Sequence, residues 1–231
     1  MIASLAIVAV GGGGGGGKRS VKGRGKVTEE AKLHPMLKAI EKELAEATTR
    51  AATLVDRVDE GMFHRRPAAD RWSIAECVVH LSLTTGAYLP LIDDALQIGR
   101  LLAVAGPRRF RRDFTGWLLC AISEPPYRYR ATTTERFVPD ASGSRGDILA
   151  EFVRLQQELT CRVYHAEGLD LTRLTIVSPF DGKLEYNLYS CFRILPTHQR
   201  RHLWQGERIL DEISALAGET HGALRLAESA D

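Results

Sequence analysis

The sequence predicts an all-α protein: an up-and-down four-helix bundle with one long crossover that contains a short extra helix. Four segments carry apolar residues at three- and four-residue steps, which places them on one face of a helix. Turn-forming residues separate these segments, and the connection between the second and third is longer than a minimal bundle needs. With 231 residues, 44% of them hydrophobic, the chain can fill one such core.

Both ends of the chain are predicted to lie outside the bundle domain, which we place at residues 28–217. Residues 1–27 hold a short apolar stretch, an uninterrupted glycine run and a basic cluster. Glycines have no side chains to pack and lose the most backbone entropy on folding, so we expect a disordered tail. The apolar stretch is too short to span a bilayer, and its positive charge follows it, unlike that of a signal peptide. Residues 218–231 are predicted to form a C-terminal tail.

The first main helix is predicted to begin near residue 28 or at Pro35 and to end near Val58. The second begins at Ser73, because Glu76 three residues later completes a capping box, and it runs to about residue 99.

The rest of the chain holds three further predicted helices. The short one in the crossover spans about 112–123, the third main helix about 147–165, and the fourth about 185–216. Pro90 and Pro196 fall inside the second and fourth main helices and should bend them, because proline removes a backbone donor and crowds the preceding turn.

Two histidines on the fourth helix, His198 and His202, are four residues apart and therefore share a face. The apolar stripe of the helix runs through that face, so both imidazoles point to the core, where they need partners. Taken alone, each of these histidines can also be interpreted as a core histidine that is hydrogen-bonded to a carbonyl. Gln205 follows on the same face and could orient His202 or a bound water. Gln199 stands where the H-E-x-x-H pattern has its glutamate, which excludes that class of metalloprotease.

A third histidine, His80, lies two turns into the second helix and shares its inward face with Thr84. Three imidazoles from two helices can hold a divalent ion and leave coordination positions open to water or substrate. Glu76, one turn before His80, is the nearest candidate for a catalytic base, or it serves only as the helix cap. Arg200 and Arg201, beside the ligand face, either anchor a substrate carboxylate or face water.

Two motifs together resemble the DinB (YfiT-like) superfamily of metalloenzymes. The pattern W-[ST]-x-x-[DE]-x-x-x-H occurs from Trp72 to His80, and H-x-x-x-H-x-x-Q occurs from His198 to Gln205. The resemblance covers about residues 33–216. It implies a DinB-like four-helix bundle in which the three histidines bind a divalent metal, often nickel (Ni) or zinc (Zn).

Members of this superfamily include S-transferases and an isomerase that depend on a low-molecular-weight thiol such as bacillithiol or mycothiol. The resemblance therefore implies a metal-dependent thiol S-transferase that acts on electrophilic small molecules in detoxification or stress. A metal-dependent hydrolase and a non-catalytic metal-binding bundle are the alternatives.

Charge and cysteine usage limit the expected partners and location. The formal net charge is +2, which gives no general reason to expect nucleic acid, and we expect the arginines of 108–112 to be solvated rather than bound to a membrane. We expect a small-molecule substrate, and a homodimer is the assembly to consider. The four cysteines form no CxxC pair, and three of them, Cys77, Cys161 and Cys191, fall in apolar helical patterns. They indicate reduced core thiols in a cytoplasmic protein.

Overall fold

The computed structural model describes four stretches of the chain: 33–103, 106, 109–126 and 133–228. Beyond residue 216 it describes the backbone alone. The predicted tail at 1–27 and the alternative helix start near residue 28 lie outside these stretches.

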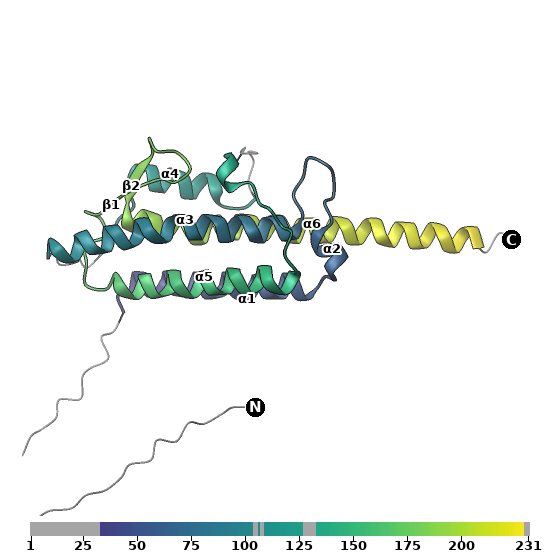
Figure 1. Cartoon of the computed structure of the whole chain (residues 1–231), viewed down its shortest axis with the longest axis horizontal. Coiled ribbons are helices and arrows are strands. Elements are labelled where there is room, and N and C mark those ends of the chain that lie inside the picture. Colours follow the sequence, from purple (N-terminus) through teal and green to yellow (C-terminus); the bar gives the residue numbers. More distant parts are fainter. Residues whose placement is uncertain (1–32, 104–105, 107–108, 127–132, 229–231) are drawn as a thin grey trace, which may run out of the picture. The chain divides into compact units, whose positions relative to one another are not determined.

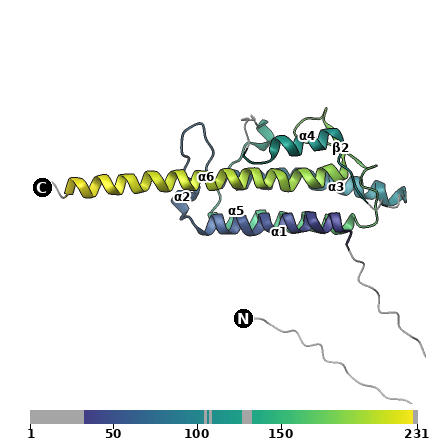
Figure 2. The same cartoon turned by 180° about the vertical axis from the view of Figure 1, so that it is seen from behind.

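The described chain is mostly helical, as predicted, and Figure 1 shows the order of its elements. The elements are α1 (Pro35–Asp56), α2 (Glu60–His64), α3 (Ile74–Leu101), α4 (Phe114–Ser123), the 3-10 turn η1 (Glu135–Phe137), α5 (Arg145–His165), β1 (Thr175–Val177), β2 (Glu185–Asn187) and α6 (Leu188–Glu228). The long helices α1, α3, α5 and α6 carry the core. Helix α3 packs against α5 and α6, α1 packs against the same two helices, and α4 packs against α6 on the outside (Figures 1 and 2).

Local sequence signals explain where the long helices begin. At α3, the Ser73 hydroxyl accepts from the Glu76 backbone N–H, and the Glu76 carboxylate accepts from the Ser73 N–H at 2.8 Å, which is the predicted capping box. Helix α1 begins at Pro35, one of the two predicted starts, and His34 Nδ1 accepts from the Met36 N–H at 3.2 Å. These bonds satisfy backbone donors that the first turn leaves unpaired.

Three features differ from the sequence prediction. The predicted connection before α3 contains the short helix α2, and β1 and β2 form an antiparallel hairpin with Ile176 opposite Tyr186. Strands of three residues are too short to show the alternation by which strands are recognised. Helix α6 therefore begins at Leu188, after β2, and it continues to Glu228 through most of the predicted C-terminal tail. Both α3 and α6 remain helical through Pro90 and Pro196.

The apolar core is divided into two clusters by polar residues near the middle of the long helices. Along α6, one cluster ends at Leu195 and the other begins at Leu203. Along α3, the same change occurs between Leu81 and Tyr88. Between these positions lie the buried polar residues Thr84, Thr85, Thr197, Gln199 and His202. The candidate site is formed at this interruption of the core.

Some of the buried polar residues at this interruption of the core form hydrogen bonds with each other. Gln156 of α5 and Gln199 of α6 exchange two amide hydrogen bonds of 3.1 and 2.6 Å, and Gln156 also donates to the Leu44 carbonyl at 3.2 Å. A buried polar pair that is fully bonded sets the register of the helices that carry it.

Helix α4 lies very close to α6 at its first turn. A Cβ at Gly116 would come within 2.2 Å of the Ser190 side chain, so the contact requires glycine. Asp113 caps α4 by accepting from the Gly116 N–H at 2.7 Å, and it also accepts from the backbone N–H of Asn187. Four large apolar side chains of α4 are exposed: Phe114, Trp117, Leu118 and Ile122.

Cys161 corrects one prediction, because it is exposed on α5, whereas Cys77, Cys120 and Cys191 are buried. All four are free thiols. In the described chain, α3 alone is long and apolar enough to cross a membrane, but 67% of its apolar window is buried inside the protein, as in a core helix.

Candidate metal centre

His80 of α3 and His198 and His202 of α6 meet at the polar interruption of the core. One ring nitrogen from each histidine lies within 4.8 Å of the other two, and Nε2 of His80 is 3.3 Å from Nε2 of His198. His80 and His202 are 3% and 9% exposed, so the group is largely shielded from water. The three rings thus converge as the sequence predicted, and this group can hold a metal ion.

Hydrogen bonds fix the tautomers of two of the rings. His80 Nδ1 lies 2.9 Å from the Phe137 carbonyl, which can only accept, so this nitrogen carries the proton. His202 Nδ1 lies 3.2 Å from Gln205 Oε1, and the amide oxygen likewise requires a donor. Both rings therefore keep the lone pair on Nε2. Gln205 thus contacts His202, one of the two groups that the sequence analysis suggested it could orient.

The electrostatics keep the rings neutral. Burial lowers the pKa of His198 to about 3, with further contributions from His80 and Arg201. Burial also lowers the pKa of His80, and it lowers the pKa of His202 well below the usual value, with the two neighbouring histidines adding to the shift. Neutral imidazole is the form that binds metal.

A divalent cation fits this donor set. The Nε2 atoms of His80 and His198 are 3.3 Å apart, and each neutral ring has a lone pair to share. The lone pair on His80 Nε2 can accept a hydrogen bond from His198 Nε2 in one neutral tautomer of His198, and in the other tautomer both nitrogens can bind one cation. Imidazole nitrogens suit zinc, nickel and similar metals.

Aromatic side chains enclose the three rings. Trp72 stacks on His202 with 5.7 Å between ring centroids, and its centroid is 4.9 Å from that of His80. Phe180 lies 6.3 Å from His80 and 6.0 Å from His198, and it stacks on Phe137 at 4.0 Å. Phe180 follows β1, and Phe137 belongs to η1 in the crossover. Neither carries a local pattern that marks it, so sequence reasoning missed both.

All three histidines line one cavity of about 430 Å³ between α3, α4, α6 and the hairpin. This volume falls in the range of small-molecule sites. The other lining residues are Trp72, Thr84, Tyr88, Leu119, Ile122, Ser123, Thr133, Ser178, Phe180, Leu184, Ile194, Leu195 and Arg201. None of these described lining residues is Asp or Glu, and most of them are apolar. We call this cavity the histidine pocket.

Three residues singled out from the sequence do not line the histidine pocket: Gln205, Glu76 and Arg200. Burial acts to raise the pKa of Glu76, but the bonds from Arg66 and Ser73 outweigh it and hold that pKa below its usual value. A carboxylate so engaged is a poor base. Arg200 donates to both oxygens of Glu124 at 2.9 and 2.8 Å and to Glu43 at 2.7 Å, so its guanidinium is already paired.

Arg201, in contrast, does line the histidine pocket, and it donates to the Ile122 carbonyl of α4 at 3.2 Å. It places a positive charge beside His198 and His202, which contributes to the low pKa values of these two rings.

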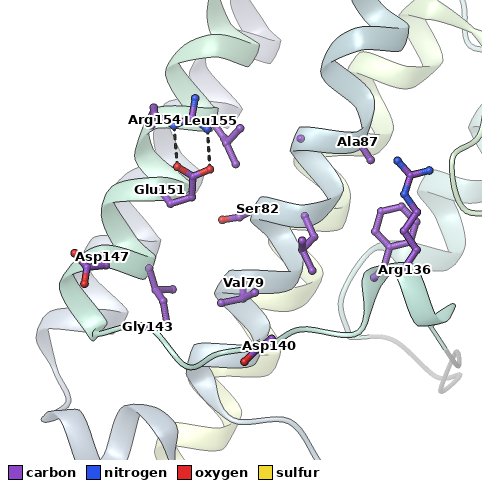
Figure 3. Close-up of a pocket in the computed structure, with 14 residues that line it drawn as sticks. Val79, Ser82, Ala87, Arg136, Asp140, Gly143, Asp147, Glu151, Arg154 and Leu155 are labelled. Carbon is purple, nitrogen blue, oxygen red and sulfur yellow. Dashed lines mark hydrogen bonds and ion pairs between the residues drawn. The ribbon is translucent and has the colours of Figure 1, made fainter.

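A second cavity, of about 590 Å³, lies between α3 and α5, and none of the three histidines lines it (Figure 3). Figure 3 shows the Glu151 carboxylate turned to the Arg154 guanidinium, with which it forms hydrogen bonds of 2.8 and 2.7 Å. Glu151 and Arg154, both on α5, thus pair with each other.

Comparisons with known proteins agree with the motifs. No curated protein and no solved structure matches the chain. The family model of the DinB superfamily matches residues 43–205, a span that includes all three histidines and Gln205. Because this match covers more than half of the sequence, the chain belongs to the DinB superfamily.

Proposed function

We propose that this protein is a metal-dependent enzyme that joins a low-molecular-weight thiol to an apolar, electrophilic small molecule. One observation carries the proposal: three neutral imidazoles with converging nitrogens open into a largely apolar pocket of ligand size. We also infer that α1, α3, α5 and α6 form the up-and-down bundle predicted from the sequence, supported by the packing of α1 and α3 on the same two helices.

The donor set favours zinc or nickel, to be held by Nε2 of His80 and His202 and by His198. A divalent ion there supplies one chemical effect, which is to stabilise the anion of a bound thiol or water. In the transfer, the thiol sulfur forms a bond to an electrophilic carbon, the leaving group departs with its electron pair, and the thiol proton passes to solvent.

The pocket lining favours a thiol over water as the nucleophile. A thiol has a pKa of about 8.5, so it loses its proton near neutral pH more readily than water does. Hydrolysis depends more on a base beside the attacking water. The described lining residues include no carboxylate, and Glu76 is engaged as a cap outside the pocket. A hydrolase is therefore the weaker candidate.

The other pocket residues have roles that follow from their chemistry. Arg201 places a positive charge where an anionic nucleophile or a substrate carboxylate would lie. Trp72 and Phe180 cover the histidines and exclude water, which protects a reactive electrophile from hydrolysis. The four free cysteines support a cytoplasmic location, where thiols stay reduced.

The test begins with the metal content of the purified protein and of two histidine variants. His198→Ala should lose most of the metal. His64→Ala should keep it, because that side chain is hydrogen-bonded to Glu60 on α2 and is not one of the three converging histidines. The metal-loaded protein is then assayed with bacillithiol, mycothiol and glutathione against monochlorobimane. We expect conjugation by the wild-type protein and by His64→Ala, and loss of conjugation in His198→Ala. Full metal content in His198→Ala would refute the site, and a loaded protein inactive with every thiol would refute the thiol transfer.

A further inference from the structure

One face of α3 carries three polar side chains into the histidine pocket. His80, Thr84 and Tyr88 follow one another at four-residue steps, so they lie above one another on consecutive turns. All three line the histidine pocket. A ligand that begins at the histidines and extends along α3 therefore passes Thr84 next and Tyr88 last.

The hydroxyl of Thr84 has no hydrogen-bond partner among the described residues, although the side chain is only 2% exposed. Buried hydroxyls nearly always find a partner, and one left alone costs stability. Thr197 is buried to the same 2%, yet its hydroxyl donates to the Arg193 carbonyl four residues earlier at 2.8 Å. A threonine in a helix can thus donate its hydroxyl to a backbone carbonyl of the preceding turn, and Thr84 does not do so.

The next residue along the face is already engaged. The Tyr88 hydroxyl bonds the Tyr186 hydroxyl of β2, and burial raises the pKa of both groups, so they stay protonated. Of Thr84 and Tyr88, Thr84 is therefore the residue whose hydroxyl is left without a hydrogen bond by the described residues.

We propose that Thr84 binds the thiol and sets specificity for it, by bonding a hydroxyl or carbonyl group carried about one helical turn from the sulfur that faces the histidines. Side chains four apart on a helix are about 5–6 Å from each other, which sets the spacing in the ligand. The ligand class is thus a small molecule with an anionic head, a hydrogen-bonding group about two to four carbons away, and an otherwise apolar surface. This inference rests on the proposed function, because the head must be held by the metal.

The experiment pairs a change in the ligand with a change in the protein. Protein loaded with Co²⁺ is titrated with 2-mercaptoethanol, 3-mercapto-1-propanol and 4-mercapto-1-butanol, and with the alkanethiols in which methyl replaces the hydroxyl. Binding is followed by the sulfur-to-cobalt charge-transfer absorption. We expect the wild-type protein to prefer the hydroxythiol of the best length by about three- to tenfold, the effect of one net hydrogen bond. Thr84→Val should lose that preference and bind the alkanethiol as well as the wild type does.

Thermal unfolding of the metal-free protein gives an independent readout. Thr84→Val should unfold at the same or a higher temperature, because it removes an unpaired hydroxyl, whereas Thr197→Val should unfold at a lower one. A clear loss of stability in Thr84→Val would show that the hydroxyl has a structural partner and would overturn the proposal. Equal binding of hydroxythiols and alkanethiols by the wild type would overturn it and leave the metal site intact. Failure of all thiols to bind the Co²⁺ protein would refute the thiol function together with this inference, and failure of Co²⁺ to bind would refute the metal site itself.

Discussion

At the scale of single residues, the three histidines link stability to pH. Burial lowers the pKa of His80, His198 and His202 in the folded protein, whereas in the unfolded chain they titrate near 6.5. Below about pH 6.5 the unfolded state therefore binds protons that the folded state excludes, and for His198 this continues down to a pKa of about 3.

We expect the free energy of unfolding of the metal-free protein to fall as the pH drops from 7 to 5. The slope is up to about 1.4 kcal/mol per pH unit for each of the three histidines. Urea unfolding at several pH values measures it. His202→Ala should reduce the slope of the unfolding free energy against pH by about the contribution of one histidine. A stability that is constant between pH 7 and 5 would contradict the low pKa values.

Variants of Glu76 can distinguish a structural role of this residue from a chemical one. Its carboxylate accepts from the Ser73 N–H and pairs with Arg66. Glu76→Ala should lower the free energy of unfolding by about 1–2 kcal/mol through loss of the cap, and Glu76→Gln should cost less because the amide oxygen still accepts. Metal content and thiol transfer should not change. Loss of transfer at unchanged stability would restore Glu76 as a catalytic group.

At the scale of elements, the sequence predicted what local signals encode. The capping box at Ser73 sets the start of α3, and the stripe through His198 and His202 places both rings on the inward face of α6. The position of α4 depends instead on Gly116 meeting Ser190, which is far along the chain, and no local pattern reports such a contact. The same holds for Phe137, whose carbonyl fixes the tautomer of His80 from within the crossover.

Gly116→Ala should displace α4 from α6. The added methyl would meet the Ser190 side chain at 2.2 Å, and an overlap of this kind typically costs about 1–3 kcal/mol. We expect faster hydrogen exchange in α4 and weaker thiol binding, because Leu119 and Ile122 of α4 line the histidine pocket. The metal affinity should change little, since no metal ligand lies on α4. Gly182→Ala, at a position with open space around it, is the matched control. Unchanged exchange in α4 would contradict the tight contact.

At the scale of the whole molecule, the metal site joins segments that are distant in the sequence. His80 and His198 are 118 residues apart, so an ion bound by both also ties α3 to α6. A ligand that binds the folded state alone stabilises it by about 2.7 kcal/mol at one hundred times its dissociation constant.

The melting temperature should therefore rise when Zn²⁺ or Ni²⁺ is added and fall again with a chelator. In His198→Ala the same additions should have no effect. An equal rise in the wild type and in His198→Ala would indicate binding elsewhere on the protein, and the absence of any rise in the wild type would argue against the site.

The two motifs were sufficient to predict which histidines meet, because each lies on a long helix whose inward face the apolar pattern defines. The pocket was not predictable in the same way. Its walls come from α4, the hairpin and the crossover, and residues such as Phe180 and Thr133 reach it through tertiary packing alone. The exposed position of Cys161 was not predictable for a similar reason, because the sequence of a helix does not show which other elements pack against it.

The division of ligands between helices has a mechanical consequence. Helix α6 supplies two histidines and also holds α4, through Asp113 at one end and through Arg200 and Arg201 at the other. Helix α3 supplies the third histidine. Metal–nitrogen bonds tolerate changes of about 0.2 Å, so a slip of α3 along α6 by even a fraction of a turn would release the ion while α4 stays attached to α6. Metal affinity is thus a gauge of the alignment of these two helices, and it would register small core substitutions that fluorescence or circular dichroism would miss.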